Sequence, residues 1–186
     1  MPSSPSGATV RYTHYSWSVE EERARPLFPP DYQFAFAEPE DAPRIASLFL
    51  AADGSPRRGA APAADAERQF AADVRAALLG DAVEFIIVRR GGALVAAAAV
   101  SADGDRVRLP VGIRVAPPHR QRNLERCLLY LALRWAKARG ALVLCARADA
   151  SLGAAEVDFG ALGGRREGGV RSAPTVALSD RPRAVG

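Results

Sequence analysis

The chain has 186 residues, of which 48% are hydrophobic and 25% charged, a composition typical of one folded globular domain. This composition excludes a wholly disordered chain, and the best uncharged apolar run, Ala93 to Val100, is far too short for a membrane helix. The formal net charge of +4 comes almost entirely from arginine, and it permits an anionic ligand without requiring one.

The targeting and cysteine patterns narrow the class of protein further. The opening residues carry neither a basic stretch nor an apolar core, so we expect no signal peptide. Cys127 and Cys145 stand in apolar runs without metal-ligand spacing, which predicts reduced core thiols and no metal site. We therefore predict a cytoplasmic protein whose partners include neither a membrane nor nucleic acid.

Prolines and composition divide the chain into three parts. Residues 1–30 are predicted to be a partly ordered N-terminal extension, because a Pro/Ser-rich start, an aromatic patch and an acidic run precede Pro29-Pro30. The aromatic patch consists of Tyr12, His14, Tyr15 and Trp17. Because it is too apolar for a free tail, we expect it to lie across the main domain or a partner. Residues 31–178 are predicted to form the main domain, and residues 179–186 a C-terminal tail.

Hydrophobic periodicity predicts a strand and two helices after Pro30. Apolar and small residues alternate over Tyr32–Phe36, which is typical of a strand. The acidic start Glu38-Pro39-Glu40-Asp41 predicts a helix that ends near Asp53-Gly54. After a loop over Gly54–Ala64, apolar residues at helical spacing predict a second helix that stops at Gly80.

The rest of the chain predicts a β-meander, one strong helix and a closing strand, helix and strand. The expected elements are strands over Val83–Arg89, Ala93–Val100 and Arg106–Val115, a helix over Asn123–Ala138, a strand over Leu142–Ala146, a weak helix over Leu152–Leu162 and a short strand over Val176–Leu178. The first two strands flank Gly91-Gly92, a hairpin signal. This order predicts an α/β (α+β layered) domain with a mixed sheet of six to seven strands and helices on both faces.

The loop between the third meander strand and the strong helix is the most informative segment. It begins after Val115, and the helix starts near Asn123. A helix N-terminus presents unpaired N–H groups and a partial positive charge, and Arg120 and Arg122 add full charges beside it. These features predict a phosphate or pyrophosphate ligand, and the alternative is a solvated cationic face that also includes Arg126.

The element order and this loop resemble the GNAT-type N-acetyltransferase superfamily. The resemblance covers roughly Gln33 to Leu178 and includes the pattern V-x-P-x-x-R-x-x-N-x-E-x-x-L-L from Val115 onward. In that family the loop binds the coenzyme A pyrophosphate through backbone amides, and the preceding strand binds the pantetheine arm. The resemblance implies acetyl-CoA or another acyl-CoA as co-substrate, without a metal. The implied coenzyme-binding residues are Ile113, Val115, Arg120, Gln121, Arg122, Asn123, Leu124, Glu125 and Arg126.

The coenzyme A signature is degenerate, because Asn123 and Glu125 stand where the family has its two signature glycines. Asparagine can adopt left-handed angles, so Asn123 could keep the turn or serve as an N-cap. Glu125 brings bulk and negative charge to the first helical turn, where it would itself favour the helix dipole. The sequence therefore leaves open whether the protein supplies this anion from its own chain.

The usual catalytic groups of the family are also replaced. Phe159 stands where many members have the tyrosine that protonates the leaving thiolate, and Arg106–Val115 contains no acid to act as a general base. The remaining candidates are His119 and Asp105, which have ordinary alternatives as an exposed loop histidine and a solvated turn acid.

Three functions follow from these observations. The first is acyl transfer from acyl-CoA to an amine of an unknown small-molecule or peptide acceptor. The second keeps the fold but takes the thioester from an acyl carrier protein, which brings pantetheine without adenosine diphosphate. The third is a fold that has lost coenzyme A binding and serves as a non-catalytic binding module or for other chemistry. The aromatic N-terminal segment could also be exchanged between the protomers of a homodimer.

Overall fold

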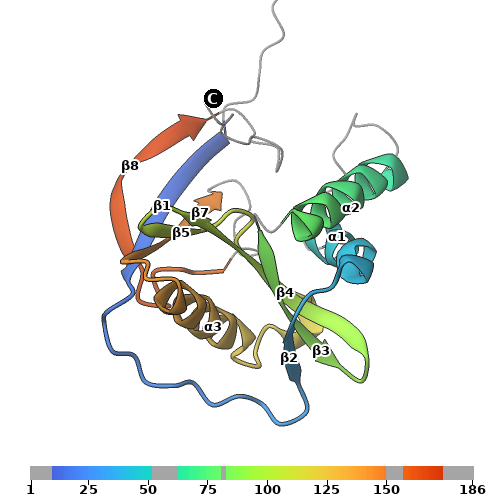
Figure 1. Cartoon of the computed structure of the whole chain (residues 1–186), viewed down its shortest axis with the longest axis horizontal. Coiled ribbons are helices and arrows are strands. Elements are labelled where there is room, and N and C mark those ends of the chain that lie inside the picture. Colours follow the sequence, from blue (N-terminus) through green and yellow to red (C-terminus); the bar gives the residue numbers. More distant parts are fainter. Residues whose placement is uncertain (1–9, 52–62, 81–82, 150–156, 174–186) are drawn as a thin grey trace, which may run out of the picture.

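One mixed β-sheet organises the described part of the chain, which comprises residues 10–51, 63–80, 83–149 and 157–173 of a computed structural model. Its eight strands are ordered β2-β3-β4-β5-β7-β1-β8, and β6 pairs with β4 beside β5 (Figure 1). The strands are β1 Val10–Ser18, β2 Gln33–Phe36, β3 Glu84–Arg90, β4 Ala93–Asp103, β5 Arg106–Leu109, β6 Ile113–Val115, β7 Val143–Asp149 and β8 Arg165–Ala173. The helices are α1 Ala42–Ala51, α2 Ala63–Leu79 and α3 Leu124–Ala138.

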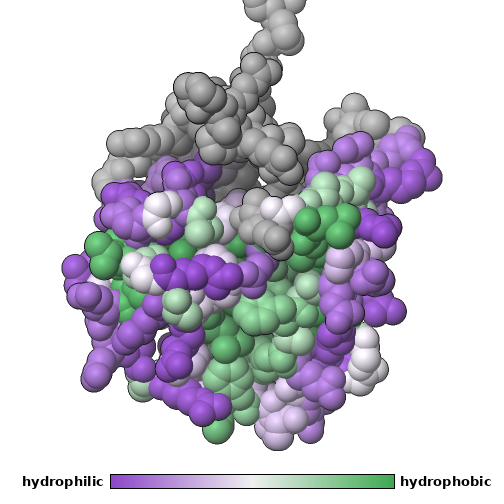
Figure 2. Space-filling model, viewed as in Figure 1, coloured by the Kyte–Doolittle hydropathy of each residue, from purple (hydrophilic) through white to green (hydrophobic). Residues whose placement is uncertain are grey.

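Helices cover both faces of the sheet, as the layered α/β prediction required. Helices α1 and α2 lie on one face, where Ile45 and Phe49 of α1 join Phe85 of β3 in one buried cluster. Helix α3 lies on the other face and buries Leu124 and Leu128 in a larger cluster (Figure 1). In Figure 2 apolar residues occupy the middle of this view, and hydrophilic residues surround them. None of the helices in the described ranges combines the length and apolar character needed to cross a bilayer.

The aromatic N-terminal segment forms β1, which lies inside the sheet between β7 and β8 (Figure 1). No strand was predicted for these residues, so β1 corrects the predicted element order. Tyr15 pairs with Ala146 on one side and Arg166 on the other. Trp17 is only 1% exposed and its ring packs edge-on against Phe159, with 5.5 Å between ring centroids. Trp17 is therefore a core residue, whereas Tyr12, His14 and Tyr15 are partly buried on a strand whose partners lie far away in the sequence.

The predicted strand Arg106–Val115 is divided into two strands. Strand β5 pairs antiparallel with β4 and parallel with β7, whereas β6 pairs with β4. The division falls at Pro110, which has no N–H to donate, and at Gly112, whose φ of 70° suits glycine. Together with β1, this division explains why the sheet has more than the six to seven strands that we predicted. Because no pairing joins β6 to β7 in the described residues, the sheet opens between them.

The C-terminal part differs from the prediction. Of the predicted helix over Leu152–Leu162, residues 150–156 lie outside the described ranges, and the chain from Val157 to Gly164 forms turns. The predicted strand Val176–Leu178 also lies outside them. The last described strand is β8, which begins with the exposed residues Arg165 and Arg166.

A segment without regular structure links β1 to β2 and passes along α3 (Figure 1). We call residues 19–30 the strap. Its first amide, from Val19, donates to Leu142 O at 2.9 Å. Further along, the Cys127 thiol of α3 donates to Leu27 O at 3.7 Å, and Phe28 packs edge-on against Tyr130. The strap therefore covers the side of α3 that faces away from the sheet.

Candidate functional site

The opening between β6 and β7 lies beside the N-terminal half of α3. Ile113 and Val115 of β6 are 1% and 4% exposed, and their side chains belong to the cluster that α3 covers. The Phe159 ring reaches the start of β6, where a Cβ on Gly112 would lie 3.9 Å from its Cζ. The backbone of β6 thus faces an opening whose far end is closed by an aromatic ring.

The turn from Phe159 to Gly164 is fixed to β1. Trp17 Nε1 donates to Leu162 O at 3.2 Å. Gly164 lies so close to Trp17 that a Cβ would come within 2.8 Å of the indole ring, so a side chain would force a shift. The Leu162-Gly163-Gly164 segment, which resembles the family's Leu-Gly motif, therefore closes the chain against an aromatic strand residue.

The loop before α3 contains the left-handed turn, which was one of the two roles that the sequence left open for Asn123. After Val115 it makes a short 3-10 turn over Pro117–His119, in which the Arg120 N–H donates to Pro117 O at 3.4 Å. Asn123 has φ 60° and ψ 20°, and it is the one non-glycine residue with positive φ among the described residues. Asn123 keeps the left-handed turn of the family's glycine, and its side chain makes no capping hydrogen bond.

Glu125 places a negative charge in the first turn of α3. Its carboxylate accepts a hydrogen bond from its own backbone N–H and is attracted by the Arg120 guanidinium, and both effects lower its pKa. Burial is the larger effect, and it raises the pKa of Glu125 above the ordinary value because desolvation disfavours the charged form. The acidic group that the sequence places in the first helical turn thus lies on its own backbone amide, and burial is the main influence on its pKa.

The loop combines backbone amides at the start of α3 with one acidic side chain, Glu125, in the first helical turn. The first four N–H groups of a helix have no intrahelical acceptor, so the amides of Leu124 and Arg126 remain oriented toward a ligand at the helix start. Arg120 lies beside them, with its Nε 3.4 Å from Val115 O. The side chains of the loop line a surface cavity of about 510 Å³, and those residues are Pro117, Pro118, Arg120, Gln121 and Arg122. The Glu125 carboxyl group lies in the first turn of α3, behind this loop.

The two candidate catalytic residues lie away from the opening. His119 Nδ1 and the Tyr32 hydroxyl are hydrogen-bonded at 2.9 Å, which holds the imidazole toward the β2 side of the sheet. Asp105 is exposed in the turn between β4 and β5, where its backbone carbonyl accepts from Leu142 N at 2.8 Å. This turn lies at the N-terminal end of β7, whereas the opening lies toward its C-terminal end. Neither side chain faces the backbone of β6.

The thiols are suited to packing rather than to nucleophilic chemistry. Burial and the nearby Glu125 charge raise the pKa of Cys127 to about 11, so this thiol stays protonated at neutral pH. Burial also raises the pKa of Cys145, with a further contribution from Glu167. Among the described residues, no three His, Cys, Asp or Glu side chains come together as a metal-ligand group.

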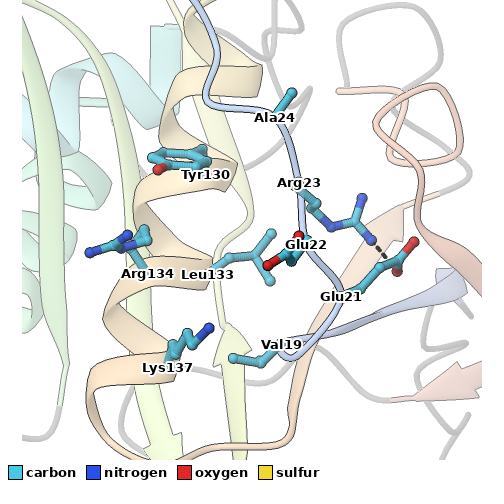
Figure 3. Close-up of a pocket in the computed structure, with 9 residues that line it drawn as sticks. All are labelled: Val19, Glu21, Glu22, Arg23, Ala24, Tyr130, Leu133, Arg134 and Lys137. Carbon is cyan, nitrogen blue, oxygen red and sulfur yellow. Dashed lines mark hydrogen bonds and ion pairs between the residues drawn. The ribbon is translucent and has the colours of Figure 1, made fainter.

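A second hollow, which the sequence did not predict, lies between the strap and α3 (Figure 3). Leu133 points from α3 toward the strap, while the Arg23 guanidinium and Glu21 carboxylate face each other at 2.7 Å. The residues lining this hollow are Val19, Glu21, Glu22, Arg23, Ala24, Tyr130, Leu133, Arg134 and Lys137. It lies along the helix from the loop, so it is separate from the candidate coenzyme site.

A set of arginines that were assigned no role from the sequence lies on the opposite face of the sheet. Arg114 of β6 and Arg147 of β7 stand on either side of the opening, on the face away from α3. The alternation of Arg106-Val107-Arg108-Leu109, with buried Val107 and Leu109, was a readable signal for such a face. The sequence alone does not show that β5 pairs with β7, and it is this pairing that places the arginines of the two strands in neighbouring rows.

An open α/β sheet beside a helix that begins at a left-handed turn is the architecture of an N-acetyltransferase domain. The Acetyltransferase (GNAT) domain family matches residues 20–164, and the chain belongs to this family. Members of the family use acetyl-CoA, as the resemblance implied. No curated protein matches the sequence at a significant level.

Several solved structures share the fold. A GCN5-related N-acetyltransferase from Kribbella flavida is 18% identical, with a TM-score of 0.54 over 86% of this chain and 56% of that chain. A GCN5-related N-acetyltransferase from Sphaerobacter thermophilus is 14% identical, with a TM-score of 0.58 over 87% of this chain and 50% of that chain. A tandem GNAT protein from the clavulanic acid biosynthesis pathway is 14% identical, with a TM-score of 0.57 over 86% and 51%. The chain thus spans about half the length of these structures.

Proposed function

We propose that the protein is an N-acyltransferase that moves an acyl group from acyl-CoA to an amine. The observation that carries this proposal is the left-handed Asn123 at the start of α3, next to a sheet that opens between β6 and β7. Most residues other than glycine adopt these angles at a cost of roughly 1–2 kcal/mol, and asparagine is one of the few that adopt them readily. The turn supports the proposal because it has the shape that glycine gives the phosphate-binding loop in the family.

In this proposal the amides from Asn123 to Arg126 and the Arg120 guanidinium hold the pyrophosphate. The backbone of Ile113 and Val115 holds the pantetheine arm within the opening. An acyl thioester supplies an already activated acyl group, so positioning accounts for much of the rate. The amine nitrogen bonds to the acyl carbon, the carbon–sulfur bond breaks, and the proton lost by the amine balances the leaving thiolate.

The proposal is tested by the thermal stability of the full chain with coenzyme A. A ligand at 100 times its dissociation constant adds about 2.7 kcal/mol of stability, or roughly 5–10 °C in a chain of this size. Arg120→Ala should remove most of this shift, whereas Arg75→Ala, the same change at an exposed position of α2, should retain it. A melting curve unchanged by millimolar coenzyme A would refute the acyl-CoA donor.

A carrier-protein thioester is the second candidate donor, and Glu125 is the observation that favours it. A carrier-bound pantetheine brings no adenosine diphosphate to the amide that Glu125 already fills. Binding of a holo carrier protein, measured beside binding of free coenzyme A, separates the two donors. If neither donor binds, the fold serves as a non-catalytic module or hosts other chemistry.

A further inference from the structure

The loop before α3 is built mostly from its own short turns. His119 N donates to Ala116 O at 2.8 Å, and Arg122 N donates to His119 O at 3.1 Å. The entry to the loop is fixed by Ala116 N, which donates to Val95 O of β4 at 2.8 Å. A surface loop held only by its own turns opens at little cost in free energy, so a bond to a distant segment matters for its shape.

Tyr32 makes such a bond with the loop. Its hydroxyl is hydrogen-bonded to His119 Nδ1 at 2.9 Å, and the two rings meet edge-on with 5.7 Å between their centroids. Within the described part of the chain, this is the one hydrogen bond that joins residues 117–122 to a segment distant in the sequence. The other side chains of these six residues line the surface cavity, whereas the His119 imidazole does not. His119 is therefore the anchor of a loop whose remaining side chains face the cavity.

Tyr32 is held in place by contacts that do not involve the loop. It is 8% exposed and belongs to the larger buried cluster. Its N–H donates to Pro29 O at 3.2 Å, and the Arg90 guanidinium lies 5.3 Å from the centre of its ring. The hydroxyl is thus presented by a core residue, and removing the hydroxyl alone should leave the ring where it is.

The strap residues just before Tyr32 hold the first half of α3. Leu27 O accepts from the Cys127 thiol at 3.7 Å, and the Phe28 and Tyr130 ring centroids are 6.2 Å apart. One short segment of the chain therefore contacts both the loop and the helix whose amides would bind pyrophosphate.

Resting on the proposed function, we propose that Tyr32 is a positioning residue whose bond to His119 keeps the α3 loop in the shape that binds the coenzyme. The apparent dissociation constant of a ligand rises as the fraction of protein in the binding shape falls. The loss of one neutral hydrogen bond lowers such a fraction roughly two- to tenfold.

Tyr32→Phe tests this role, because it removes the hydroxyl and keeps the ring. In titration calorimetry the full-length variant should bind coenzyme A roughly two- to tenfold more weakly than the wild type. Binding of pantetheine, which lacks pyrophosphate, should be unchanged when followed by ligand-observed NMR, a difference that a general folding defect would not produce. Tyr130→Phe is the matched control, since it deletes the same atom from a tyrosine that packs on the strap, and it should bind both ligands as the wild type does.

Two further measurements locate the effect in the loop. Amide hydrogen exchange of the ligand-free protein should be faster at Arg120 and Arg122 in Tyr32→Phe than in the wild type. Tyr32→Phe combined with His119→Ala should bind coenzyme A no more weakly than His119→Ala alone, because both changes remove the same bond.

The outcomes separate this proposal from the proposed function. The positioning role is overturned if Tyr32→Phe and the wild type bind coenzyme A equally, if pantetheine binding falls to the same extent, if loop exchange is unchanged, or if the two substitutions are additive. A wild type that binds no coenzyme A would instead refute the acyl-CoA donor, and the positioning role with it.

Discussion

Replacing Glu125 by glutamine is the sharpest perturbation of the α3 loop. Because burial raises the pKa of Glu125, the protonated carboxyl suits the folded state better than the carboxylate does. The favourable contribution of the protonated Glu125 carboxyl to the free energy of unfolding is therefore complete at a pH below the pKa that Glu125 has in the unfolded chain. This contribution is lost as the pH rises through the higher pKa that Glu125 has in the folded protein. Glu125→Gln should remove this loss, so the variant gains stability relative to the wild type as the pH rises from 4 to 7.

The same change should strengthen coenzyme A binding. A unit charge about 5 Å from a phosphate charge interacts with roughly 3 kcal/mol at an effective dielectric constant near 20, before salt screening. The glutamine carbonyl can still accept from the amide, and the favourable dipole interaction of the carboxylate, about 0.3–1 kcal/mol, is lost in the free protein. We expect a net gain of about 1–3 kcal/mol, or roughly five- to 150-fold in the dissociation constant.

Titration calorimetry with coenzyme A at pH 5 and pH 7 measures both effects. The wild type should bind more tightly at pH 5, where Glu125 takes up a proton more readily, and the variant should lose this part of the pH dependence. Glu40→Gln, at an exposed position of the turn before α1, is the control and should behave as the wild type. Wild type and Glu125→Gln binding with the same affinity at pH 7 would show that the carboxylate does not compete with phosphate.

Two further variants test the shape of the site. Asn123→Ala should lower the free energy of unfolding by about 1 kcal/mol in urea titrations, because alanine tolerates φ 60° poorly, while Asn123→Gly should stay near the wild type. An alanine variant as stable as the wild type would contradict this account of the turn. Phe159→Tyr, which restores the family's hydroxyl, should lose about 1–3 kcal/mol, because the ring is 1% exposed and its Cζ faces Gly112. Unchanged stability would indicate that the hydroxyl finds a partner in the opening.

The elements that the sequence predicted are those whose signals are local. Helix α3 was expected over Asn123–Ala138 and is found over Leu124–Ala138, because its apolar face repeats at helical spacing. The hairpin at Gly91-Gly92 was likewise readable, and both glycines have positive φ. Strand β1 could not be found in this way, since both of its partner strands lie near the other end of the chain. Its aromatic residues indicated burial but not where they would be buried.

The same distinction holds for the candidate site. The loop between Val115 and Asn123 was predicted from contiguous residues, and the left-handed turn was one of the two roles that they left open for Asn123. The opening between β6 and β7 exists because β5 pairs with β7 whereas β6 pairs with β4. These pairings join strands that are distant in the sequence, so no contiguous stretch of residues indicates them. Arg114 and Arg147 were therefore assigned no role from the sequence, because only the sheet register brings them to one gap.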